Sequence, residues 1–151
     1  MKIKLIMPNV KEHNVDNKEK YIIGQEFKLL PLNLAMLAAL TKAEMEISIV
    51  DEAMEQINFD EQVDLVGITS TTSVVTRAYE IAEEYRKRDV KVVLGGTHPT
   101  LTPHEAKRYA DAVCIGEAEG LWGEMLADFK MGKLKEVYRN DGYCSIFEID
   151  Y

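Results

Sequence analysis

The chain has 151 residues, of which 46% are hydrophobic and 29% charged, as expected for one globular domain. Its net charge of −8 argues against binding to nucleic acid or to anionic membrane surfaces, because both require a basic footprint. Two cysteines, Cys114 and Cys144, form no disulfide framework, so we expect a reduced cytoplasmic protein. The start reads as a strand stopped by Pro8, not as a signal peptide, and no apolar run is long enough to span a bilayer.

Strand-like and helix-like patterns alternate along the whole chain. In chain order they predict strand 3–7, helix 32–43, strand 47–50, a weak helix 53–57, strand 65–69, helix 73–88, strand 90–94, a short helix 103–109, strand 112–115 and helix 121–131. The helix over 32–43 is apolar nearly all round, which predicts deep cover. Thr102-Pro103-His104-Glu105 predicts a capping box, and Gly132 is expected to end the last helix.

This alternation predicts an α/β fold, a flavodoxin-like (Rossmann-like) three-layer sandwich. Its parallel sheet would have five strands in the order 2-1-3-4-5. Two segments depart from the alternation. Residues 9–30 form a long charged connection of the kind that is usually functional or disordered. Beyond Gly132 the pattern fades, and residues 137–139 and 143–151 read either as a strand pair or as the start of something missing.

Two glycine-bearing segments each follow an apolar run directly. Gly95-Gly96-Thr97-His98-Pro99 follows the fourth predicted strand, and Gly116-Glu117-Ala118-Glu119-Gly120 follows the fifth. The carboxyl ends of parallel strands are where α/β sheets bind ligands, and glycine lets a ligand approach the backbone closely. We therefore expect a ligand edge that also includes residues 8–10, Asp51 and residues 70–73.

The polar residues at this edge have alternative interpretations. The four hydroxyl residues 70–73 can cap the following helix or hydrogen-bond a polar ligand. A lone His98 is more often structural than a metal ligand, and His104 reads as a surface helix residue. Glu117 and Glu119 could act as an acid-base pair, but we favour a capping role for Glu119 at the last helix.

The sequence does not predict a nucleotide-binding motif or a catalytic site. The glycine spacing fits neither a dinucleotide fingerprint nor a P-loop. No Ser-His-Asp or Cys-His arrangement is assignable, and Cys114 is expected to be an inert thiol inside its strand. We therefore predict no catalytic site and no protein metal ligand in this chain alone.

An ordered set of segments carries a resemblance to a known family. The set is Leu30-Pro31-Leu32-Asn33-Leu34-Ala35-Met36-Leu37-Ala38-Ala39-Leu40, Val50-Asp51, Asp64-Leu65-Val66-Gly67-Ile68-Thr69-Ser70, Val93-Leu94-Gly95-Gly96-Thr97-His98-Pro99-Thr100 and Gly116-Glu117-Ala118-Glu119-Gly120. Over residues 1–139 the chain resembles the N-terminal cobalamin (B12)-binding domain of B12-dependent radical SAM proteins. The resemblance is to the group of magnesium-protoporphyrin IX monomethyl ester cyclase-like proteins.

The resemblance implies that a corrin lies over the carboxyl edge and that its nucleotide tail inserts beside the sheet. It implies the following cofactor-binding residues: Pro31, Leu32, Leu34, Ser70, Thr71, Thr72, Gly95, Gly96, Thr97, Gly116 and Glu117. Many cobalamin domains also carry an Asp-x-His-x-x-Gly motif whose His binds cobalt. Here the corresponding loop has only His13, framed by Lys11 and Asp16, so we expect cobalamin to bind base-off without a histidine on cobalt.

The resemblance also implies a partner domain. Radical SAM domains use S-adenosyl-L-methionine (SAM) and a [4Fe-4S] cluster on Cys-x-x-x-Cys-x-x-Cys, and Cys144 stands alone here. Residues 140–151 would then be a tail or the start of a missing radical SAM domain, present in cis or in trans. The alternatives are a cofactor-free flavodoxin-like signalling or interaction domain and a flavin binder. Both are weakened, the first by Met7-Pro8-Asn9 in place of receiver carboxylates and the second by the absence of a phosphate loop after the first strand.

Overall fold

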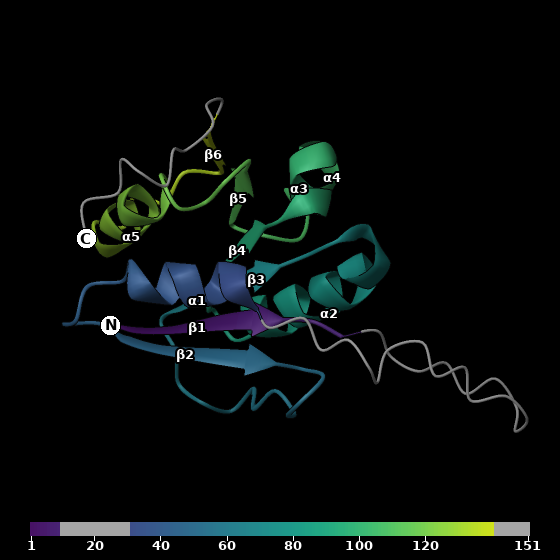
Figure 1. Ribbon diagram of the computed structural model, residues 1–151, viewed down its shortest axis with the longest axis horizontal. Helices are drawn as coiled ribbons and strands as arrows, with labels where there is room; N and C mark the ends of the chain where they lie inside the picture. The colour runs from purple at the N-terminus through teal and green to yellow at the C-terminus, as the bar shows by residue number, and fades with distance from the viewer. Residues whose placement is uncertain (10–30, 141–151) are drawn as a thin grey trace, which may run out of the picture.

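The computed structural model describes residues 1–9 and 31–140, so the predictions for His13 and for residues 143–151 lie outside the described residues. A parallel six-stranded sheet has the order β2-β1-β3-β4-β5-β6, which Figure 1 shows from bottom to top. Its strands are β1 (Lys2–Met7), β2 (Glu46–Asp51), β3 (Leu65–Thr69), β4 (Lys91–Gly95), β5 (Ala112–Ile115) and β6 (Val137–Arg139). The flavodoxin-like α/β prediction is confirmed. The sixth strand, β6, adds to the predicted five by pairing in parallel with β5.

Helices connect the strands and cover the sheet. They are α1 (Leu32–Ala39), the 3-10 turn η1 (Thr72–Val74), α2 (Val75–Arg86), α3 (Thr97–Leu101), α4 (Pro103–Ala106) and α5 (Trp122–Lys130). The weak helix predicted over 53–57 is absent. Instead, the Asp51 side chain accepts a hydrogen bond from the Ala53 N–H at 2.9 Å, and the Asp51 carbonyl accepts from Met54 and Glu55. This local turn replaces a helical start.

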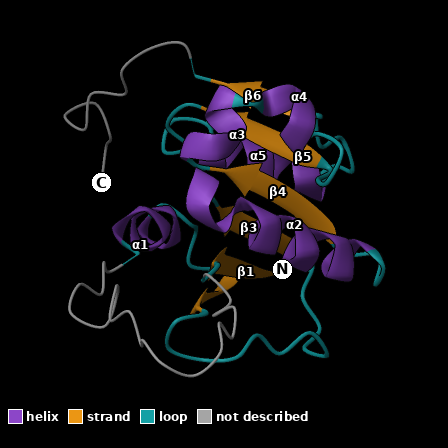
Figure 2. Ribbon diagram, turned by 90° about the vertical axis from the view of Figure 1, so that its right-hand side faces the viewer, coloured by secondary structure: helices purple, strands orange, loops and turns teal. Residues whose placement is uncertain are grey.

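The strands bury both of their faces, as their continuous apolar runs predicted. One face packs against α1 and α5; its buried residues are Ile3, Leu5, Leu34, Leu65, Val93, Ala112, Cys114, Trp122, Met125, Leu126 and Tyr138. The other face packs against α2; among its buried residues are Ile6, Val66, Ile68, Ala78, Ile81, Tyr85, Val92, Leu94, Val113 and Ile115. Neighbouring strand residues alternate between the two lists because side chains alternate across a pleated strand. Figure 2 shows α1 and α2 on different sides of β3.

The first helix differs most from its prediction. It ends at Ala39 instead of residue 43, and Leu34 is its only buried residue, while Leu32 is 71% exposed. The deep cover predicted for this helix is therefore wrong for the described part of the chain. A helix that packs on a sheet needs only one apolar stripe to face that sheet. Apolar residues outside the stripe therefore do not show that the helix is covered on its other sides.

The loop after β4 is also more ordered than expected. It forms α3, and the predicted capping box at its end is not made: no side chain caps α4. The Thr102 hydroxyl instead donates to the His98 carbonyl at 3.0 Å, which joins the two short helices. Among the described residues, no helix has the length and apolar content to cross a membrane.

Candidate functional site

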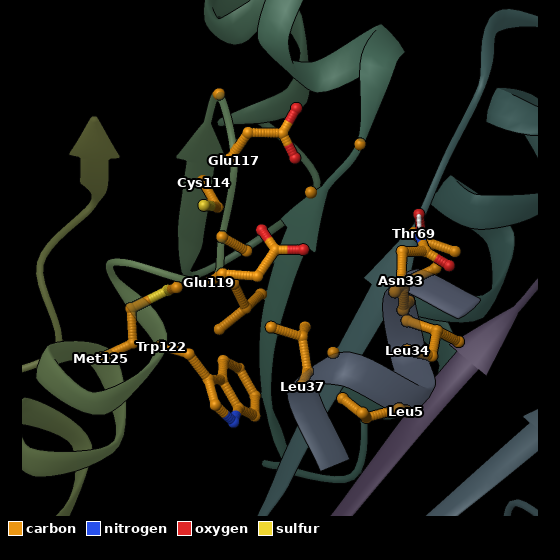
Figure 3. Close-up of a pocket in the computed structure, with 17 residues that line it drawn as sticks. Leu5, Asn33, Leu34, Leu37, Thr69, Cys114, Glu117, Glu119, Trp122 and Met125 are labelled. Atoms are coloured by element: carbon orange, nitrogen blue, oxygen red, sulfur yellow. Dashed lines mark hydrogen bonds between the residues drawn. The ribbon is translucent and has the colours of Figure 1, made fainter. Parts of the chain in front are cut away.

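A cavity of about 90 Å³ lies on the α1/α5 face of the sheet, near its carboxyl edge. Side chains from α1, α5 and four strands surround it, together with the loops after β4 and β5 (Figure 3). Its lining is Leu5, Asn33, Leu34, Leu37, Gly67, Ile68, Thr69, Val93, Gly95, Gly96, Cys114, Gly116, Glu117, Ala118, Glu119, Trp122 and Met125. The interior is therefore mainly apolar, and polar side chains gather where α1 and the loops meet the strand ends.

The floor of the cavity depends on Gly67 in the central strand β3. A Cβ at this position would lie 2.8 Å from Leu5 Cδ2 and 3.9 Å from Trp122 Cη2. The first distance is shorter than carbon atoms tolerate, so any larger residue would displace Leu5, which itself lines the cavity. Glycine at 67 thus keeps the space above the sheet open.

Two hydrogen bonds connect the elements around the cavity. The indole Nε1 of Trp122 donates to Thr41 Oγ1 at 2.9 Å, which ties α5 to the turn after α1. The Asn33 side-chain amide donates to Thr69 Oγ1 at 2.8 Å, which ties the first turn of α1 to the end of β3. Both walls of the cavity are therefore fixed relative to each other and to the sheet.

The loop after β4 packs directly on the loop after β3. The Ser70 N–H donates to the Gly95 carbonyl at 2.9 Å, and the His98 N–H donates to the Ser70 carbonyl at 3.1 Å. Gly96 between them has φ 99° and ψ −171°, a conformation essentially restricted to glycine. A Cβ there would lie 2.7 Å from Ser70 O, so both conformation and close approach require glycine at this position.

The loop after β5 has a related construction. Gly116 has φ 85°, and a Cβ there would lie 2.7 Å from the Asn140 carbonyl oxygen. Its N–H donates to Thr100 Oγ1 of α3 at 3.0 Å. The two glycine loops are thus linked through α3 and together border one side of the cavity.

Charge at the cavity comes from Glu117 and Glu119. In Figure 3 the Glu119 carboxylate extends toward the side chains of α1, and Glu117 lies higher on the same loop. Burial, together with the nearby carboxylates of Glu119 and Glu117, raises the pKa of the Cys114 thiol to about 12. Cys114 therefore remains a neutral thiol, as predicted, but it lines the cavity rather than lying away from it. No side chain forms a hydrogen-bonded cap on α5, so Glu119 does not cap this helix by a hydrogen bond.

The structure brings five of the eleven predicted site residues into the cavity lining: Leu34, Gly95, Gly96, Gly116 and Glu117. The other six lie elsewhere. Pro31 and Leu32 begin α1 outside the lining, and Thr97 is an exposed residue of α3. The remaining three, Ser70, Thr71 and Thr72, belong to the neighbouring loop. Whether any of the eleven binds a cofactor stays a prediction.

The hydroxyl residues after β3 neither cap a helix nor face the cavity. Ser70 is buried and its hydroxyl donates to the Thr71 carbonyl, and Thr71 shares a hydrogen bond with Ser73. The Thr72 hydroxyl lies 3.1 Å from His98 Nδ1. His98 is 8% exposed, and its contact with Thr72 joins α3 to the β3 loop, while its Nε2 lies 3.6 Å from the Glu105 carboxylate, too far for a hydrogen bond.

Most of the apolar lining was missed from sequence. Gly67, Leu37, Trp122 and Met125 were assigned only to a strand or a helix, because their spacing is equally that of ordinary core residues. Gly67 alone gave a usable signal: a glycine inside a buried strand run often marks a close approach of another group. Within the described residues, no three His, Cys, Asp or Glu side chains cluster as metal ligands would.

Comparison with known proteins identifies the family. A model of the B12 binding domain matches residues 21–125. The chain is 47% identical over 127 residues to a bacteriochlorophyllide d C-8(2)-methyltransferase of Chlorobaculum tepidum, covering 82% of this chain and 28% of that protein. It is 36% identical over 112 residues to the C-12(1)-methyltransferase of the same organism, covering 73% and 25%.

A third relative is also a methyltransferase, and a solved structure has the same fold. An uncharacterized methyltransferase of Pyrococcus horikoshii is 32% identical over 146 residues, covering 88% of this chain and 30% of its own length. The crystal structure of the N-terminal domain of a hypothetical Thermotoga maritima protein has the same fold, with TM-score 0.50 and 21% identity over 80% of this chain and 99% of that one. The chain spans less than a third of the length of the curated relatives it matches. It belongs to the B12-binding domain family.

Proposed function

We propose that this chain is the cobalamin-binding module of a methyltransferase and that the nucleotide tail of cobalamin enters the cavity between α1 and α5. The observation that carries the proposal is the apolar cavity itself, which opens beside two glycine loops in a chain of the B12-binding family. The cavity fits such a tail because Gly67 leaves its floor without a side chain and Gly95, Gly96 and Gly116 border it without bulk.

Apolar and acidic residues of the cavity would contact different parts of cobalamin. Leu34, Leu37 and Trp122 would pack on the flat faces of the nucleotide base, where apolar burial contributes about 25 cal/mol per Å². Glu117 and Glu119 would accept hydrogen bonds from the side-chain amides of the corrin. When bound, cobalamin supplies a cobalt centre able to carry a methyl group, while this chain binds and orients it.

We further propose that cobalamin binds base-off with no histidine on cobalt. His98 supports this, because its ring is largely buried, contacts Thr72 through Nδ1 and does not line the cavity. His104 is exposed on α4, on an element that does not line the cavity. The remaining histidine, His13, lacks the Asp-x-His-x-x-Gly frame.

The complete protein would join this module, over about residues 1–139, to a radical SAM domain that holds SAM and a [4Fe-4S] cluster. The identity to two bacteriochlorophyllide d methyltransferases supports a chlorin-type substrate for the complete protein. The substrate would contact the partner domain and the exposed face of the corrin, because the described cavity is too small for a tetrapyrrole ring.

The test is a titration of the purified chain with hydroxocobalamin, followed by absorbance and by the thermal midpoint. Binding should stabilise the chain by about 2.7 kcal/mol at a hundredfold excess over the dissociation constant. In the cob(II)alamin state, electron paramagnetic resonance should show no nitrogen coupling from the protein. No spectral or thermal change at millimolar ligand would reject the proposal in favour of a cofactor-free interaction domain. A nitrogen coupling that disappears in His13→Ala would reject base-off binding without histidine.

A further inference from the structure

The interior of the cavity, between Leu37, Trp122 and Met125, offers a bound base very few side-chain hydrogen-bond donors. Of the side chains that line it, Trp122 has its only N–H engaged by Thr41 Oγ1, and in Figure 3 that nitrogen lies on the side away from Glu119. The Asn33 amide donates one of its two N–H groups to Thr69 Oγ1, and in Figure 3 these two residues, with the donors that they retain, lie where α1 meets the end of β3, away from Trp122 and Met125. Cys114 is a neutral thiol, which is at best a weak donor.

The two carboxylates of the lining add hydrogen-bond acceptors and no donors. Glu117 and Glu119 contribute carboxylate oxygens, which only accept hydrogen bonds when ionised. The remaining side chains of the interior, such as Leu5, Leu37, Val93 and Met125, are apolar. A base whose ring atoms are acceptors would therefore exchange hydrogen bonds with water for contacts with apolar groups and carboxylates, which costs free energy for each unpaired acceptor.

We infer that the cavity selects cobamides by their lower base and favours dimethylbenzimidazole over adenine. This inference rests on the proposed function. Dimethylbenzimidazole has a single free ring nitrogen and two methyl groups, which suit an apolar wall. Adenine has several ring nitrogens that need donors; its amino group could find Glu119, but its ring acceptors would remain unpaired.

The experiment compares cobalamin, adeninylcobamide and cobinamide, which has no nucleotide. All three are reduced to the cob(I) state, in which cobalt holds no lower ligand, so the cost of releasing the base from cobalt does not enter. Dissociation constants are measured by anaerobic ultrafiltration. We expect cobalamin to bind at least about tenfold more tightly than adeninylcobamide, which is the effect of leaving one acceptor unpaired.

A matched pair of variants tests the cause. Leu37→Gln adds a side-chain donor to the α1 wall, and Leu37→Met keeps that wall apolar at a similar volume. The dissociation constant of adeninylcobamide divided by that of cobalamin should fall severalfold in Leu37→Gln. The same ratio should be unchanged from wild type in Leu37→Met. Thermal midpoints of the free variants establish that both are folded.

The outcomes separate the two proposals. If none of the three cobamides binds, the proposed function itself fails. Equal binding of cobalamin and cobinamide would overturn the placement of the tail in the cavity and with it the selectivity. If cobalamin exceeds cobinamide but equals adeninylcobamide, only the inference of base selection is overturned.

Discussion

The indole N–H of Trp122 donates a hydrogen bond to Thr41 Oγ1 across 81 residues of sequence, at 2.9 Å. Trp122 is 1% exposed and forms one wall of the cavity, while Thr41 follows the helix that forms the other. The Thr41 hydroxyl in turn donates to the Leu37 carbonyl at 2.7 Å. One threonine therefore connects the α5 wall to the α1 wall.

Replacing Thr41 by Val should destabilise the chain by about 1–3 kcal/mol, because it leaves a buried indole N–H without an acceptor. The thermal midpoint should fall by roughly 2–4 °C per kcal/mol for a domain of this size. Thr41→Ser keeps the hydroxyl and is the control. Equal midpoints for the Val and Ser variants would show that the hydrogen bond contributes nothing measurable.

Replacing Gly67 by Ala should both destabilise the chain and weaken cobalamin binding, because the new Cβ would lie 2.8 Å from Cδ2 of Leu5, which lines the cavity and would have to shift. Overpacking of this kind costs about 1–3 kcal/mol. The control is Gly123→Ala in α5, where a Cβ meets nothing within 4 Å and should stabilise the helix slightly. Urea unfolding and hydroxocobalamin titration measure the two effects, and an unchanged affinity in Gly67→Ala would remove this glycine from the account of the cavity.

Replacing Gly96 by Ala should separate the loops after β3 and β4. Alanine must adopt φ near 99° and place its Cβ 2.7 Å from Ser70 O, so we expect a loss of about 2 kcal/mol or more. Gly132→Asn is the control: Gly132 has φ 67° with open space around it, and asparagine tolerates that left-handed conformation. A Gly96→Ala variant no less stable than Gly132→Asn would contradict the close packing of these two loops.

A pH-dependent contribution to stability comes from the amino end of the sheet, away from the cavity. Hydrogen bonds from Lys2 and Lys4 lower the pKa of Glu61 from 4.5 to about 2. The Lys4 ammonium is buried and lies 2.6 Å from Glu61 Oε2. Because the folded pKa is depressed, the stabilisation is complete above the unfolded pKa and is lost as the pH falls from about 4.5 to about 2.

Glu61→Gln should therefore cost about 1–2 kcal/mol at pH 7, after allowance for solvent screening, and progressively less as the pH falls through this window. Glu44→Gln removes an exposed pair with Lys130 and serves as the control. Urea unfolding at pH 7, 4 and 3 measures the difference. A cost for Glu61→Gln that stays constant with pH would contradict the assignment.

The parallel sheet could be predicted because each strand is a short apolar run bounded by turn residues. Strands β3 and β5 even begin and end at the predicted residues, 65–69 and 112–115. Residues 137–139 were one half of a possible strand pair, and they form β6, but its partner is β5 in parallel, a tertiary contact that periodicity does not reveal. The turn at Asp51 likewise depends on one side-chain hydrogen bond that competes with a helix.

For the site, sequence located the mouth of the cavity but not its interior. Gly96 and Gly116 follow strand ends, and the rule for ligand edges in α/β sheets applies to them directly. Trp122 and Leu37 lie on the faces of helices that pack on the sheet, and nothing in their spacing distinguishes a cavity wall from a filled core. The cavity exists because Gly67 has no side chain, and this effect depends on the position of Leu5, which a side chain at residue 67 would contact.

The most direct test of the tail in the cavity is a nuclear Overhauser experiment on the chain with diamagnetic cob(III)alamin. Trp122 is the only tryptophan of the chain, so its indole protons are identified without ambiguity. We predict cross-peaks between these protons and the methyl groups of the dimethylbenzimidazole base. Tight binding of cobalamin without any such cross-peak, while Trp122 is resolved in the spectrum, would contradict the account.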